Sequence, residues 1–403
     1  MSWTADPDGH RALVCSVLRG NAAGNTGGSL AGGDPEGAAM YALGHGLGPA
    51  LSRIVADNDS DPKGALKDSY RRTAAANMVL YRELARVLDV LAGVEPAMPV
   101  MVLKGCSLAA WLYDSPALRP MCDADIMVPG DRVEEAVQRV RELGYRDEQP
   151  EMGGGLAHDA SHHVKLVSRE WHASAVEIHW TLLGSSGDWR SPPMDWFWRH
   201  TEAWRPPSDL QKSEEADSLG GMVVQLDPTA MLLHLAAHLV LGHGEADGRL
   251  LWLYDIHLLV EKAGDRVDWK EAAERACDFS WGPALATALE QSRDSFGTTV
   301  DDALIAQFSA TGDRRSSRFV EIKNQPVQTR LLWNLQHLGA KSWPLRVRML
   351  LALLFPSPAY IRWRYNPRPA WAWPLCYPWR WLDALGDLAR TVYRLAFRRA
   401  STR

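Results

Sequence analysis

Asp123 and Asp125 stand two residues apart in an otherwise apolar segment, DADIMV. Such a segment is typical of a β-strand, in which residues two apart point to the same face. Two carboxylates on one face repel each other unless a cation or a proton relieves the repulsion. Hard oxygen ligands suit Mg²⁺, which also binds substrate phosphates. The pair therefore predicts a divalent-metal site, with a solvated pair at a strand end as the alternative for this pattern alone.

Two further segments give the aspartates a context. Before them, PVMVLKG reads as a strand that ends in Gly105, followed by Cys106, Ser107 and a short helical pattern. A glycine at a strand-to-helix turn lets the backbone approach a phosphate, while helix amides and a hydroxyl donate hydrogen bonds. After them, AVEIHW carries Glu177 among apolar residues, where an acid is costly unless it is paired or bound to a metal. The alternative for Glu177 is a half-exposed strand position.

Two cations and a histidine lie near these segments in the sequence. Lys104 and Arg119 are candidates for holding phosphate oxygens, the arginine in a bidentate manner. Their alternative is a surface cation beside an acidic site. His179 stands two residues after Glu177, on the same predicted face. It is a candidate for orienting a carboxylate or an acceptor hydroxyl.

A second set of histidines lies farther along the chain. His234 and His238 are four residues apart on a predicted helix, and His243 follows near its end. With Asp255 they are candidates for a zinc or iron site. The apolar surroundings favour a packing or substrate-orienting role instead. No role is predicted for four residues on or beside a Gly-rich loop, which are His158, Asp159, His162 and His163.

The elements that must position these residues follow from the hydrophobic pattern. Strand signals occur in PVMVLKG, DADIMVPG, HHVKLVS and SAVEIHWTL, with helical patterns between them. After Leu226, Asp227 and Pro228 form an N-cap and first helical position, and helical periodicity continues. The sequence predicts an α+β protein with a mixed-sheet core, flanking helices and an all-helical domain. The predicted parts are a helical and Gly-rich segment at 1–65, the core at 66–205, a polar linker at 206–219, the helical domain at 226–340 and a basic Trp/Arg-rich tail at 341–403.

The segments LKGCSLAAWLYDSPALRPMCDADIMV, LGY and VEIHW, in this order, resemble the nucleotidyltransferase superfamily, and more closely a bacterial group of uncharacterised nucleotidyltransferases. The resemblance continues through HLAAHLVLGHG and LLWLYDIHLLV. It implies three metal-binding and catalytic carboxylates, which are Asp123, Asp125 and Glu177. It also implies a phosphate-facing turn at Gly105 and Ser107. Where the superfamily often has Gly-Gly or Gly-Ser, this chain has Cys106 after Gly105, and the serine, Ser107, lies one residue later.

The implied reaction moves a nucleoside monophosphate from a nucleoside triphosphate to an acceptor hydroxyl or phosphate and releases pyrophosphate. The implied ion is Mg²⁺, with Mn²⁺ as the alternative, and the active cleft is expected between the core and the helical domain. Two other classes stay open. One is a non-catalytic nucleotide- or partner-binding module of the same fold, and the other is a histidine-based metal hydrolase.

Charge limits the class of acceptor. The net charge is −5, but the residues from Lys341 onward carry +10, which leaves −15 on the preceding 340. A long nucleic acid is normally held by many phosphate contacts, so we expect a small-molecule or peptide acceptor instead. The tryptophans of the basic tail include those at 363, 371, 373, 379 and 381. They fit packing against the helical domain, a weak membrane-surface contact, or a surface for a polyanion or protein partner.

Composition is that of an ordinary globular chain, with 46% hydrophobic and 23% charged residues among 403. The five cysteines are scattered and lack paired spacing, which favours a reducing compartment. The N-terminal segment has no apolar stretch typical of a secretory signal. The longest apolar run in the tail, 349–355, is too short to cross a bilayer. A cytoplasmic location is therefore expected.

Overall fold

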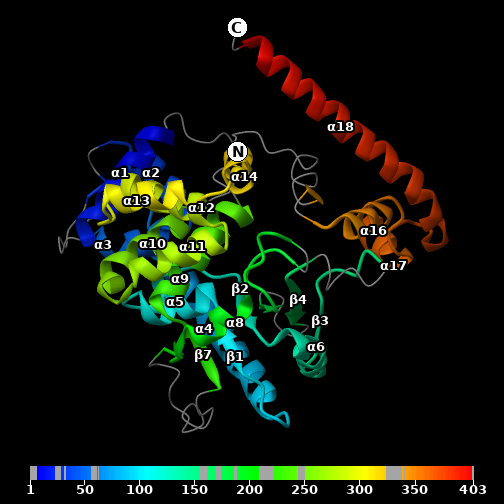
Figure 1. Ribbon diagram of the computed structural model, residues 1–403, viewed down its shortest axis with the longest axis horizontal. Helices are drawn as coiled ribbons and strands as arrows, with labels where there is room; N and C mark the ends of the chain where they lie inside the picture. The colour runs from blue at the N-terminus through cyan, green and yellow to red at the C-terminus, as the bar shows by residue number, and fades with distance from the viewer. Residues whose placement is uncertain are drawn as a thin grey trace.

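The computed structural model consists of a sheet covered by helices and a C-terminal arm that ends in a long helix (Figure 1). The described residues are 7–22, 29–30, 33–55, 61, 63–153, 161–168, 174–185, 188–207, 222–243, 250–323, 338–339 and 341–401. His158, Asp159 and the predicted linker from residue 208 onward lie outside them.

Within these described ranges, seven strands form one mixed sheet in the order β3-β4-β5-β2-β1-β7-β6. Their bounds are β1 Val100–Val102, β2 Asp123–Met127, β3 Tyr145–Asp147, β4 His163–Ser168, β5 Ala175–His179, β6 Thr201–Ala203 and β7 Val223–Leu226. The pairs β2–β5 and β1–β7 are parallel, and the other four pairs are antiparallel. This confirms the predicted α+β class with a mixed sheet. The strand that carries the two aspartates lies in the interior of the sheet.

Strands β1, β2, β4 and β5 coincide with the four predicted strand segments. The other strands, β3, β6 and β7, contain three or four residues each and were not predicted. Of these, β7 is the most consequential because it pairs with β1, with Val100 opposite Val223. The sheet therefore continues to Leu226, directly before the helical region begins.

One face of the sheet is apolar and covered by α4 (Ala65–Ala92) and α6 (Val133–Glu142). In α4, buried residues recur at steps of three and four, which places them on one side of the helix. They share a core with Ala124 and Ile126 of β2 and Ile178 of β5. Since strand residues alternate between faces, the neighbouring residues Asp125 of β2 and Glu177 of β5 point to the opposite face.

A second core lies on that opposite face. It contains residues from helices at the beginning of the chain and from helices after the last strand. The helices are α1 Pro7–Ala22, α2 Pro35–Gly44, α3 Gly48–Ile54, α5 Lys104–Trp111, α8 Met194–Arg199, α9 Pro228–Ala237, α10 Leu250–Ala263, α11 Trp269–Asp278, α12 Gly282–Phe296, α13 Asp302–Ala310 and α14 Arg314–Lys323. Helix α1 contacts α12 directly. Arg11 Nη2 donates to Ser295 Oγ at 3.1 Å, and Arg19 Nη2 donates to the Asp294 carbonyl at 3.0 Å.

The predicted helix cap at Asp227 and Pro228 is confirmed. Asp227 Oδ1 accepts a hydrogen bond from the Ala230 amide at 2.9 Å, and Pro228 takes the first helical position of α9. A π-helical turn, His238–His243, follows α9. Single π-helical turns, in which hydrogen bonds span five residues, are frequent at functional sites.

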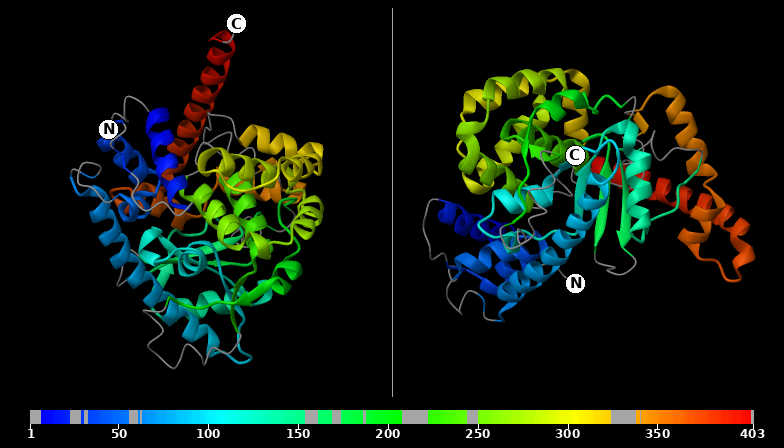
Figure 2. Two further views of the ribbon diagram at one scale, coloured as in Figure 1. Left: turned by 90° about the vertical axis from the view of Figure 1, so that its left-hand side faces the viewer. Right: turned by 90° about the horizontal axis from the view of Figure 1, so that it is seen from below.

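The arm contains α16 (Trp343–Leu354), α17 (Pro358–Tyr365) and α18 (Cys376–Ser401). Contacts that join it to the body include Ser357 Oγ, which donates to the Glu151 carbonyl at 2.7 Å, and Lys341 Nζ, which lies 2.9 Å from Asp188 Oδ2. Helix α18 extends away from the body (Figure 1 and the left view of Figure 2). No helix within the described ranges is both long and apolar enough to span a bilayer.

Candidate active site

The register of β2 and β5 brings three carboxylates to one face of the sheet. Asp125 lies directly opposite Glu177, and Asp123 stands two residues earlier on β2. The Asp125 side chain is nearly fully buried, while those of Asp123 and Glu177 are 28% and 13% exposed. The structure therefore brings together the three acids that the sequence nominated.

Two lysines face these acids. Lys165 Nζ lies 3.1 Å from Asp123 Oδ2 and 3.2 Å from Glu177 Oε1, so its ammonium bridges two of the carboxylates. Lys104 Nζ donates to Asp125 Oδ1 at 2.9 Å. Lys165 belongs to β4, where it stands opposite Glu177. Three carboxylates thus meet two ammonium groups.

The environment separates the pKa values of the three acids. Burial raises the pKa of Asp123, and repulsion from Asp125 and Glu177 adds to the effect, with only partial compensation by Lys165. Burial also opposes ionisation of Asp125, but Lys104 and His179 outweigh it and hold the pKa well below the ordinary value. For Glu177, the nearby rings of His179 and His163 overcome burial and lower the pKa to about 2. Asp123 is therefore the acid whose charge is least compensated.

These residues fit a divalent cation. The nearest ligand atoms of Asp125, Glu177 and His179 all lie within 4.8 Å of one another, which is close enough to share one ion. The ammonium of Lys165 already occupies the space between Asp123 and Glu177, where positive charge is favoured. A predominantly carboxylate donor set suits Mg²⁺ or Mn²⁺.

At the turn between β1 and α5, Gly105 packs against Arg119. A Cβ atom at Gly105 would lie 2.9 Å from Arg119 Nη1 and 3.2 Å from Met121 Sδ, so only glycine fits without displacing them. Ser107 is fully buried, and its Oγ donates to Gln225 Oε1 of β7 at 2.9 Å. Contact of Gly105 or Ser107 with a phosphate stays a prediction.

Arg119 forms a buried ion pair with α10. Its Nε donates to Asp255 Oδ1 at 2.9 Å and its Nη2 to Asp255 Oδ2 at 2.7 Å. Tyr113 Oη also donates to Asp255 Oδ1, at 2.7 Å. Asp255, which the sequence grouped with the later histidines, thus pairs with Arg119. A triphosphate contact by Arg119 stays a prediction, and two of its nitrogens already have a carboxylate partner.

Three histidines lie beside the carboxylates. His179 Nε2 lies 3.0 Å from Asp125 Oδ1, and His163 stands opposite His179 on β4. The His162 ring lies 4.5 Å from that of His163 and 5.6 Å from that of His179, between centroids. Burial lowers the pKa of His162 well below its ordinary value, and burial together with His179 lowers that of His163 to about 4.

The later histidines form a separate group. The rings of His234 and His238 are 6.0 Å apart, and that of His243 lies 4.7 Å from His238 and 4.6 Å from Trp252. Burial, followed by the nearby charge of Lys104, lowers the pKa values of His234 and His238. Within the described part of the chain, neither group of residues with metal-ligand spacing contains these histidines.

Sequence reasoning missed Lys165 and His163. A signal was present, because in HHVKLVS these two residues alternate with Val164 and Leu166. The alternation puts the polar residues on the face of the carboxylates and the apolar ones in the core of α4 and α6. Which strand would pair with this segment could not be read from it.

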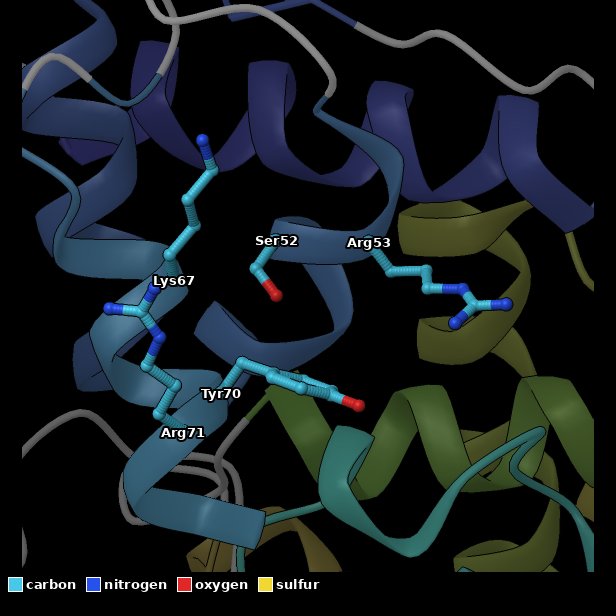
Figure 3. Close-up of a pocket in the computed structure, with 5 residues that line it drawn as sticks. All are labelled: Ser52, Arg53, Lys67, Tyr70 and Arg71. Carbon is cyan, nitrogen blue, oxygen red and sulfur yellow. The ribbon is translucent and has the colours of Figure 1, made fainter.

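A cavity of about 300 Å³ lies elsewhere, on α3 and α4. It is lined by Ser52, Arg53, Lys67, Tyr70 and Arg71 (Figure 3). Arg53 reaches away from Lys67 and Arg71, so the cationic groups do not converge. Since none of the predicted site residues lines it, this cavity is distinct from the carboxylate site.

Comparison with protein families gives one match. The model of a family described as uncharacterised nucleotidyltransferase matches residues 33–297. This segment runs from before α2 to the end of α12 and contains the whole sheet, the three carboxylates and the later histidines. Comparisons with curated proteins and with solved structures gave no match.

Proposed function

Because this chain belongs to a nucleotidyltransferase family, we propose that it transfers a nucleoside monophosphate from a nucleoside triphosphate to an acceptor and releases pyrophosphate. The observation that carries the proposal is the convergence of Asp123, Asp125 and Glu177 on one sheet face, with Lys165 between two of them. The three carboxylates pair with lysines in the free protein. The same negative charge would attract the divalent cation that accompanies a nucleoside triphosphate.

Asp123, Asp125 and Glu177 are the proposed ligands of Mg²⁺, or of Mn²⁺ in its place. When bound, the ion neutralises phosphate charge and activates the attacking hydroxyl. Lys104 and Lys165 lie beside the acids and supply the charge for holding triphosphate oxygens. His179, through its contact with Asp125, holds that carboxylate in orientation.

Gly105 is the proposed point of close phosphate approach, at the N-terminus of α5, where backbone amides are unpaired. Arg119 is held by Asp255, and its Nη1 is the atom nearest to the position that a Cβ atom at Gly105 would take. In this proposal Arg119 and Ser107 fix the turn, and contact with the triphosphate by either side chain requires a rearrangement of its present hydrogen bonds.

The proposed acceptor is a small molecule or a peptide. The residues before Lys341 carry −15, which disfavours a long polyanion. The cations near β2 are engaged: Lys104 pairs with Asp125, Arg119 with Asp255, and Arg132 with Glu135. Five free cysteines and the use of a nucleoside triphosphate are consistent with a cytoplasmic protein.

The arm has its own proposed role, a weak contact with an anionic lipid surface. Apart from Met40 and Met78, every exposed large hydrophobic side chain of the described residues lies in the arm. Trp371 and Trp379 are 75% and 61% exposed, so packing against the helical region does not account for them. Aromatic and basic side chains together bind anionic headgroups.

The proposed reaction is tested with Asp123→Asn and Asp125→Asn. Incubation of the protein with each nucleoside triphosphate, Mg²⁺ and a cell extract should release pyrophosphate, and each variant should lower the rate by about 100-fold or more. Asp147→Asn is the matched control, because Asp147 lies on β3 of the same sheet and pairs with Arg141 at the surface. Pyrophosphate release near the wild-type rate by the double variant would contradict the proposal.

The same material distinguishes a non-catalytic binding module. A nucleoside triphosphate that stabilises the protein against heat only with Mg²⁺, without any labelled acceptor in the extract, would favour binding over transfer. No stabilisation by any of the four nucleotides with Mg²⁺ would contradict nucleotidyl transfer and favour a module that binds a partner.

A further inference from the structure

His162, His163 and His179 form a second set of possible metal ligands beside the carboxylates, with one nitrogen of each lying within 4.8 Å of the others. We propose that these three histidines bind a transition-metal cation of the zinc class, separate from the ion held by Asp123, Asp125 and Glu177. The proposal goes beyond nucleotidyl transfer and does not depend on it.

The strands fix two of the three ligands. His163 of β4 and His179 of β5 are direct partners in an antiparallel pair, so their side chains stand next to each other on one face. Their ring centroids are 4.9 Å apart. His162 immediately precedes β4, and its carbonyl accepts a hydrogen bond from the Trp180 amide at 3.1 Å, which ties it to the residue after His179. The backbone therefore positions all three residues.

Two ring nitrogens in this set lack a hydrogen-bond partner among the described residues. They are Nδ1 of His163 and Nδ1 of His179, and both atoms are buried. His179 is fully buried as a residue, so the unpaired nitrogen cannot be satisfied by bulk water. A buried polar atom without a partner costs free energy, and a bound ion is one explanation for its persistence.

The remaining nitrogen of His179 has the partner expected for a metal ligand. Its Nε2 lies 3.0 Å from Asp125 Oδ1, and an N–H at this position donating to the carboxylate leaves the lone pair on Nδ1. Histidines that bind metals usually donate their other ring N–H to a carboxylate or carbonyl in this way. The negative charge of Glu177, whose Oε2 lies 3.7 Å from His163 Nε2, also favours a nearby cation.

The donor type selects the ion. Three imidazole nitrogens suit zinc and its neighbours, whereas Mg²⁺ prefers oxygen ligands. A set of three protein ligands leaves a position for water or a substrate atom on zinc. The carboxylates and the histidines would therefore hold different ions at adjoining positions.

The test uses the full-length protein, stripped with a chelator and titrated with Zn²⁺ alone or with Co²⁺ alone, in the presence of excess Mg²⁺. The wild type should bind one ion per chain, and bound Co²⁺ should show the visible absorption of nitrogen coordination. The His162→Gln/His163→Gln variant should weaken Zn²⁺ binding by more than about 100-fold, beyond the effect of losing a group that only orients a ligand. Asp125→Asn, which removes the orienting carboxylate, should weaken it by about 10–100-fold.

Two controls keep the result interpretable. Asp123→Asn should retain Zn²⁺ binding, because Asp123 is not one of the three ligands. His200→Gln should also retain it, since His200 contacts Asp227 and Glu271 at the far end of the sheet. His162→Gln alone serves if the double variant fails to fold, because His162 lies outside β4 and is only half-buried.

Three results would overturn the proposal: no Zn²⁺ binding by the wild type, binding unchanged in the histidine variants, or binding abolished by Asp123→Asn. The last would assign the ion to the carboxylates. Because the titration contains no nucleotide, its failure leaves the pyrophosphate assay unaffected, and the two proposals fail separately.

Discussion

At the scale of single residues, Lys165 offsets part of the repulsion between the neighbouring carboxylates of Asp123 and Glu177. Its ammonium contacts both carboxylates, and these two acids in turn raise the pKa of Lys165 despite the burial that lowers it. Hydrogen bonds between charged groups contribute roughly 1.5–3 kcal/mol each. A divalent ion at the same acids would compete with the ammonium, and this exchange can be measured without a substrate.

Lys165→Met should lower the free energy of unfolding by about 1–3 kcal/mol in chelator, because two neighbouring acids lose their shared cation while the apolar stem is kept. Saturating Mg²⁺ should restore most of the loss. Thermal unfolding in chelator and in Mg²⁺ measures both effects. Lys63→Met is the control, since Lys63 pairs with Glu36 at the surface and should change stability by less than about 1 kcal/mol in either condition. A Lys165→Met protein as stable as the wild type in chelator would contradict this role.

A residue's place in the site could be predicted from local sequence, but its contacts could not when the partner lies many residues away along the chain. Asp123 and Asp125 were nominated from local alternation and Glu177 from its apolar neighbours, and the family resemblance grouped the three; none of this needs knowledge of strand pairing. Lys165 and Asp123 are 42 residues apart, and their contact depends on the register of three strands. Arg119 was expected at a triphosphate because its partner Asp255, 136 residues away, could not be identified from the sequence.

At the scale of elements, the pair of Arg119 and Asp255 joins the segment before β2 to helix α10. Both side chains are almost fully buried, at 7% and 1% exposure. A buried ion pair is a weak source of net stability, but removal of one partner leaves the other charge uncompensated. The link therefore couples the turn at Gly105, where an added Cβ would lie 2.9 Å from Arg119 Nη1, to the packing of the helical region.

Asp255→Ala should destabilise the protein by about 3–5 kcal/mol, since the Arg119 guanidinium would stay buried without its carboxylate. Urea unfolding measures the loss. Asp114→Ala is the matched control, because Asp114 is 72% exposed, pairs with Lys262, and should cost less than about 1 kcal/mol. A small effect of Asp255→Ala would mean that Arg119 reaches another anion, and would favour the triphosphate contact that the sequence predicts.

The elements themselves were predictable where the sequence carries an apolar run, an alternation or a helix cap. Strands β1, β2, β4 and β5 lie in apolar or alternating segments, and α9 begins at a recognisable cap. Strands β3, β6 and β7 are too short to show a period, and they exist because a neighbour supplies hydrogen bonds. A strand such as β7, placed beside β1 after more than a hundred intervening residues, is a product of tertiary pairing.

At the scale of the whole molecule, charge and exposed apolar surface are segregated in the arm. The body before Lys341 carries −15 and the remainder +10. Trp343 of α16, at 72% exposure, adds to the exposed tryptophans already described. Monomeric proteins seldom expose so much apolar surface in one part unless it meets a partner or a membrane.

Deletion of residues 376–403 should abolish co-sedimentation with vesicles containing anionic lipid, while leaving Mg²⁺-dependent stabilisation by nucleotide unchanged. The reason is that α18 contributes arginines and exposed leucines to the arm but none of the site residues. Full-length protein should bind anionic vesicles at low salt, weaken at high salt, and ignore neutral vesicles. Tight, salt-sensitive RNA or DNA binding lost on the same deletion would show that the arm serves a polyanion instead.

The contact between α1 and α12 has a consequence for synthesis at the ribosome. Arg11 and Ser295 are separated by 284 residues, so the first helix leaves the ribosome long before its partner exists. At about 5–20 residues per second, the delay is roughly 15–55 s. During that interval Val14 and Leu18, both fully buried in the finished protein, have no α12 to cover them. The nascent chain therefore presents a hydrophobic helix to chaperones until the sheet and most of the helical region have been made.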